Sequence, residues 1–136
     1  MKKLDNFSNC LTILANADFK MAETNDIYRT GVIGQFNLTF ELAWKALQEI
    51  MRKHGVEDSS AGSPREILQL GYKFGFIDDS ETWLLMLKKR NISVHIYNED
   101  EIDELILLIR DSFMLAFTVL KDTLVKKLEE AESDWM

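Results

Sequence analysis

The residues of this chain best suited to chemistry lie together in one short stretch, from Arg90 to Tyr97. His95 can take up or release a proton near neutral pH. Arg90, five positions earlier, offers a planar guanidinium whose shape matches a phosphate group. Tyr97 adds a hydroxyl, and Lys88 and Lys89 make this the most basic part of the chain. These are the side chains that acid–base chemistry on a phosphate ester requires.

A structural interpretation of the same residues is also open. Arg90 could cap the end of a helix and pair with Glu99 or Asp100. His95 could be a hydrogen-bonded interface histidine, and Tyr97 a half-buried ring. Arginine and histidine at this spacing are common by chance, so the spacing alone favours the structural interpretation.

Other kinds of site have no signature in the sequence. A phosphate-binding loop, a dinucleotide fingerprint and a nucleophile elbow are all absent. His54 and His95 lie far apart, and neither has a second ligand at helical spacing, so we expect no metal and no cofactor. The single cysteine, Cys10, favours a reducing compartment and is expected to pack inside. Without an apolar leader or a run long enough to span a bilayer, the chain is expected to be soluble and cytoplasmic.

Composition and charge narrow the class of protein. The 136 residues fit one domain, which we place over residues 1–136, and 46% of them are hydrophobic. Six glycines and one proline favour few, long helices. The net charge of −7 argues against a protein that coats nucleic acid but leaves room for a small basic site.

The helices that must position the candidate site can be located from hydrophobic period and caps. We expect helices over about 3–22, 26–54 and 63–75, then from Asp78 or Asp79 to Arg90, and from about 98 to 130. Gly55 and Gly75 are expected to end two of them, and the run from Ser63 to Glu66 predicts a capping box. The predicted fold is all-α, an up-and-down antiparallel bundle of four long helices and one short helix. Its apolar surface exceeds what one core can cover, which predicts a homodimer or a permanent partner.

Three segments of the chain resemble a known family. They are Phe36–Lys45, Ser63–Glu66 and Trp83–Tyr97, which occur in this order with flanking helices of suitable length. Together they are similar to the nucleotidyltransferase substrate-binding family, which belongs to the HEPN superfamily and includes HepT-like toxins.

The resemblance implies a dimerising helical bundle and a partner, a minimal nucleotidyltransferase encoded by an adjacent gene. It also implies the toxin half of a toxin–antitoxin module. In HepT-like members the pattern of Arg90 and His95 resembles a metal-independent endoribonuclease site, formed where two protomers meet. Arg90 would steady phosphate charge and His95 would transfer a proton, with Asn91 and Ser93 in support. Tyr97 matches the residue that the partner modifies with AMP.

A non-catalytic function is the alternative. Other members of the family are substrate-binding subunits of a nucleotidyltransferase, in which Arg90 and His95 would bind nucleotide or face the partner enzyme. Glu41, Trp44 and Lys45 are further candidates for contact with nucleotide or partner. Their structural interpretation is an ion pair between Glu41 and Lys45 on one helix face, and packing of Trp44.

Overall fold

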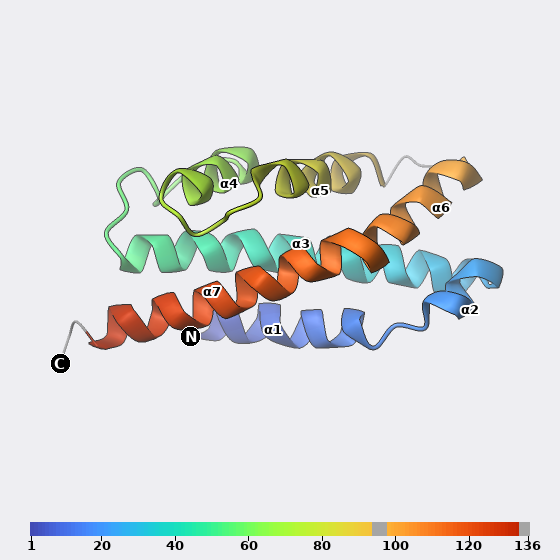
Figure 1. Cartoon of the computed structure of the whole chain (residues 1–136), viewed down its shortest axis with the longest axis horizontal. Coiled ribbons are helices and arrows are strands. Elements are labelled where there is room, and N and C mark those ends of the chain that lie inside the picture. Colours follow the sequence, from blue (N-terminus) through green and yellow to red (C-terminus); the bar gives the residue numbers. More distant parts are fainter. Residues whose placement is uncertain (94–97, 134–136) are drawn as a thin grey trace.

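The computed structural model describes residues 1–93 and 98–133, and within them every regular element is a helix. The elements in chain order are α1 (Lys2–Ala15), α2 (Phe19–Thr24), α3 (Asp26–Lys53), α4 (Pro64–Lys73), α5 (Ser80–Ser93), α6 (Glu99–Leu108), the π-helical turn η1 (Ile109–Phe113) and α7 (Met114–Ser133). Successive long helices reverse direction, and α3 lies between the α4–α5 layer and α1 (Figure 1). This confirms the predicted all-α antiparallel bundle. None of the described helices has the length and apolar content needed to cross a membrane.

The first predicted helix, over 3–22, is interrupted, and short polar side chains explain the break. Asp18 caps α2 because its Oδ1 accepts a hydrogen bond of 3.0 Å from the Met21 backbone N–H. Asn25 caps α3 in the same way, accepting from the Tyr28 N–H at 2.9 Å. Such side chains compete with the helical backbone for hydrogen bonds, so they end one helix and begin the next.

Several helix boundaries follow the predicted signals, although α5 continues past the predicted end at Arg90 to Ser93. Ser63 and Glu66 form both hydrogen bonds of a capping box at the start of α4. Gly55 and Gly75 take positive φ angles of 72° and 79°, which glycine adopts at little cost. At the start of α5, hydrogen bonds from the hydroxyl and the backbone N–H of Thr82 lower the pKa of Asp79.

The C-terminal helix contains a wide turn that periodicity did not predict. Ile109, Phe113 and Phe117 are spaced by two steps of four, which exceeds the 3.6 residues of a regular turn. All three are fully buried, and the π-helical turn between the first two keeps them on the core side. The α6–η1–α7 run therefore presents one continuous apolar face despite its irregular spacing.

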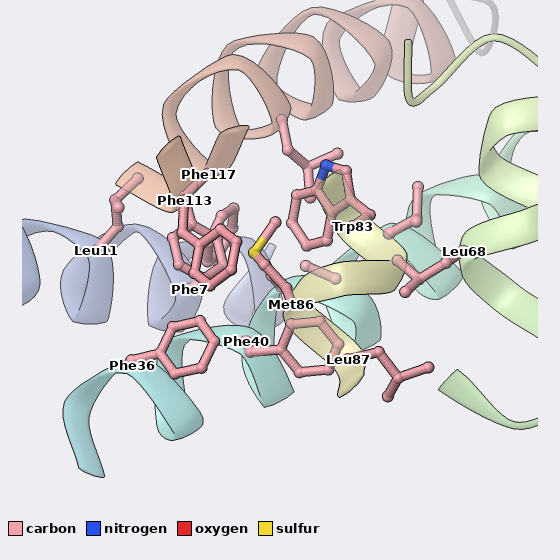
Figure 2. Close-up of a cluster of buried hydrophobic side chains, with 14 of the residues drawn as sticks. Phe7, Leu11, Phe36, Phe40, Leu68, Trp83, Met86, Leu87, Phe113 and Phe117 are labelled. Atoms are coloured by element: carbon pink, nitrogen blue, oxygen red, sulfur yellow. The ribbon is translucent and has the colours of Figure 1, made fainter. Parts of the chain in front are cut away.

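Aromatic side chains from four helices meet in the core and place α5 against α3 (Figure 2). Phe117 contacts the rings of Phe7, Phe36 and Trp83 at centroid distances of 6.2, 6.1 and 5.6 Å. Trp83 also lies 6.1 Å from Phe40 of α3. Because α5 is held through Trp83, the polar residues at its C-terminal end are brought over the middle of α3.

Candidate functional site

The candidate site lies where the last turn of α5 crosses the middle of α3, and Arg90 is its central residue. The Nη2 of Arg90 lies 2.7 Å from Oε2 of Glu41, and its Nη1 donates to Oδ1 of Asn91 at 3.2 Å. The Arg90 side chain is 34% exposed and that of Glu41 27% exposed. Two acceptors thus fix the guanidinium of a side chain that is partly open to solvent.

The partner of Arg90 differs from the one that the structural interpretation expected. In the described residues Arg90 pairs with Glu41 and not with Glu99 or Asp100. Those two carboxylates stand at the start of α6, whereas the Arg90 side chain is directed to α3. The site is therefore built between α3 and α5.

Glu41 bridges two cations. Its Oε1 lies 3.4 Å from the Nζ of Lys45, one helical turn along α3, while its Oε2 binds Arg90. The predicted ion pair between Glu41 and Lys45 is present, but it belongs to a cluster of three residues that also contains Arg90. One carboxylate and two cations leave a net positive charge, which suits an anion.

Ser93 is tied to α3 through a residue that sequence reasoning missed. Asn37 Nδ2 donates to the Ser93 hydroxyl at 2.9 Å, and that hydroxyl donates to the Arg90 carbonyl at 2.8 Å. Asn37, Glu41 and Lys45 are spaced by four residues and form a polar stripe on α3. That stripe was the signal that could have identified Asn37.

The other candidates divide into those the structure describes and those it does not. Trp44 is half-buried against the core, and its Nε1 has no hydrogen-bond partner among the described atoms. His95 and Tyr97 fall in residues 94–97, outside the described residues. Just before that segment, Lys89 Nζ binds Glu104 of α6 at 2.9 Å, so α5 is linked to the helix that follows. Residues 1–93 and 98–133 contain no cluster of three or more metal-ligating side chains.

Comparison with known proteins places this helical bundle in a family. The family model described as nucleotidyltransferase substrate binding protein like matches residues 2–126. A curated relative from Haemophilus influenzae, named "Probable ribonuclease HepT", is 27% identical over 107 residues, which are 72% of each chain. The chain belongs to the nucleotidyltransferase substrate-binding family, as the resemblance implied.

Solved structures share the fold. A Haemophilus influenzae protein, described as having the fold of a substrate-binding domain of a nucleotidyltransferase, superposes with a TM-score of 0.75 at 22% identity. The match covers 89% of this chain and 98% of that one. A Thermus thermophilus protein gives a TM-score of 0.66 at 26% identity, covering 90% and 98% of the two chains.

Proposed function

We propose that this protein is the toxin component of a two-gene module and cleaves RNA without a metal ion, using Arg90 and His95. Its partner would be a minimal nucleotidyltransferase encoded by the adjacent gene. Membership of the nucleotidyltransferase substrate-binding family supports the partner, and the relative named as a ribonuclease supports the activity. The observation that carries the proposal is the partly exposed Arg90 side chain, whose guanidinium is held by Glu41 and Asn91.

The held guanidinium matters because it is oriented before substrate arrives. A free arginine side chain loses rotamer freedom when it binds a phosphate, whereas Arg90 has already lost much of it to Glu41 and Asn91. A fixed donor placed where negative charge develops stabilises a transition state without reorganising. Arg90 is thus suited to the charge that builds up on a phosphate during transfer.

The reaction that fits these side chains is internal transesterification of RNA. The ribose 2′-oxygen attacks the adjacent phosphorus while a neutral His95 takes its proton. The bond to the 5′-oxygen breaks, and a protonated His95 from the second protomer of a dimer gives that oxygen a proton. The products are a 2′,3′-cyclic phosphate and a 5′-hydroxyl. A two-fold axis supplies the second histidine that a single chain lacks.

Tyr97 provides the means of control in this proposal. The partner nucleotidyltransferase would transfer AMP from ATP to the Tyr97 hydroxyl, releasing pyrophosphate. The added phosphate brings negative charge two residues from His95 and competes with RNA for Arg90.

Cleavage by the purified protein in EDTA tests the proposal directly. A single-stranded RNA should be cut to fragments ending in 2′,3′-cyclic phosphate and beginning with 5′-hydroxyl, both resolved by mass spectrometry. The DNA of the same sequence should stay intact because it lacks the attacking 2′-oxygen. Cleavage of that DNA, or loss of RNA cleavage in EDTA, would contradict the proposed mechanism.

Glu41 serves as a positioning residue, and Glu41→Gln is expected to lower kcat about tenfold with a smaller change in KM. Glutamine keeps an acceptor oxygen but removes the charge that binds Arg90 and Lys45. Glu49→Gln is the matched control, because Glu49 also bridges two cations, Lys3 and Arg52, outside the site. Equal losses of kcat in the two variants would show that Glu41 has no special role.

A non-catalytic function is the second candidate, favoured by the net charge of −7, which suits a protein partner better than long RNA. The chain would then bind and present substrate to the nucleotidyltransferase. Co-purification with the adjacent gene product, with no RNA cleavage by either the chain or the complex, would support it. Growth arrest by the chain alone would exclude it.

A further inference from the structure

A groove of about 480 Å³ lies beside the candidate site, between the start of α4 and the outer face of α5. Its apolar lining includes Leu84, Leu85 and Ile92, and Ile92 is exposed. Two cationic side chains, Arg65 and Lys88, and the amide of Asn91 supply its polar groups. The lining thus combines apolar side chains with positive charge.

Among the described residues, the lack of a carboxylate partner sets Arg65 apart from the other arginines, whereas Lys88 shares it with six other lysines. The remaining arginines, Arg29, Arg52, Arg90 and Arg110, each lie within 4 Å of a carboxylate, as does Lys89. Within the described part of the chain Arg65 and Lys88 have no such partner. In a chain of net charge −7, two uncompensated cations lining one groove favour an anionic ligand.

The groove and the candidate site share one residue, Asn91. Asn91 lines the groove and accepts the hydrogen bond from Arg90. A ligand that contacts Asn91 in the groove would therefore be one side chain away from a phosphate held by Arg90. The volume of the groove falls within the range of about 300–1,000 Å³ that is usual for small-ligand sites, which is enough for one nucleotide.

We propose that this groove binds the nucleotide next to the scissile phosphate of single-stranded RNA. Arg65 and Lys88 contact its phosphate, and the base lies on Leu84, Leu85 and Ile92. The proposal rests on the proposed function, because it assumes that the phosphate at Arg90 belongs to RNA. In this proposal, residues outside the Arg90–His95 pair bind the RNA strand. The local positive charge of the groove lets a protein with a net negative charge bind a polyanion.

Binding of a short fluorescein-labelled single-stranded RNA, followed by fluorescence anisotropy, tests the proposal. The measurements use the His95→Ala background, so that the strand stays intact. Arg65→Gln and Lys88→Gln should each weaken binding about fivefold and reduce the slope of log Kd against log salt by about 0.7, as expected for one lost phosphate contact on a single strand. With His95 restored, each change should raise KM and leave kcat nearly unchanged.

Lys126→Gln is the matched control, since it removes the same charge from an exposed position of α7 that does not line the groove. Thermal unfolding of all three variants should match that of the parent, because exposed substitutions rarely alter stability by more than about 0.5 kcal/mol. An unchanged affinity and salt slope in the groove variants, an equal change in Lys126→Gln, or no RNA binding by the parent would each overturn the proposal. If the groove variants bind RNA normally but no longer bind the nucleotidyltransferase, the groove is a site for an acidic segment of that protein.

The assignment of the groove and the assignment of the catalytic pair can be tested independently. If His95→Ala cleaves RNA as the wild type does while the groove variants bind RNA weakly, the catalytic assignment is wrong and the groove assignment stands. If His95→Ala is inactive while Arg65→Gln and Lys88→Gln bind RNA normally, only the groove assignment is wrong.

Discussion

Replacing His95 with alanine is expected to lower the rate of RNA cleavage by a factor of about 10²–10⁴ and to relieve growth arrest in cells that express the protein. Alanine can neither accept the proton of the 2′-hydroxyl nor return one to the leaving 5′-oxygen. In a symmetric dimer a single substitution removes both functions at once. Initial rates on labelled RNA and growth curves after induction measure the two effects.

The chain supplies its own control for this change in His54, its only other histidine. His54 Nε2 lies 2.6 Å from the Lys127 carbonyl, and its ring packs edge-on against Phe76 at 5.7 Å. His54→Ala should therefore lower stability and leave the cleavage rate of the folded protein unchanged. If His95→Ala is as toxic and as active as the wild type, the ribonuclease proposal fails.

Phe117→Ala is expected to lower the free energy of unfolding by about 3–5 kcal/mol. The Phe117 ring is fully buried and contacts rings from α1, α3 and α5, so its loss opens a cavity where the helices meet. Urea denaturation followed by circular dichroism at a fixed protein concentration measures the change.

Leu115→Ala, two residues earlier on α7, is the control for the core substitution. Its side chain is 68% exposed, so truncation should change the free energy of unfolding by no more than about 0.5 kcal/mol. A loss below about 1 kcal/mol in Phe117→Ala would mean that the ring cluster does not hold the bundle together. A large loss in Leu115→Ala would indicate that this exposed leucine is covered by another chain.

The parts of the fold that depend on local chemistry were predictable. The capping box at Ser63 and the left-handed ends at Gly55 and Gly75 occur where the sequence places them, because each needs only residues within one turn. The helix over 26–54 was also predictable from its hydrophobic period, and the apolar side chains that recur along it, Phe36, Phe40, Ala43, Leu47 and Ile50, are fully buried. The hydrophobic period and the capping residues predict these features from residues that are close in the chain, without any distant contact.

The candidate site was predictable in its residue types but not in its contacts. Arg90 and Glu41 are 49 positions apart, and their pairing depends on how α5 lies across α3. That arrangement is set by Trp83 and the aromatic core, which no local pattern encodes. For the same reason the sequence suggested Glu99 and Asp100, which are near in the chain, as partners for Arg90. Whether His95 approaches Arg90 stays a prediction, since it lies outside the described residues.

The wide turn at Ile109–Phe113 has a consequence for how this protein can vary in length. A π-helical turn contains one residue more than the α-helical turn it replaces. The helices on either side of it still direct the same faces to the core. Removing a single residue there would let the segment relax to regular geometry without rotating Phe117 or Leu124 out of the interior. Anywhere else along α6 or α7 the same deletion would turn every later side chain by about 100°, given 3.6 residues per turn. This turn is thus a place within the C-terminal helix where loss of one residue leaves the packing of Phe117 and Leu124 intact.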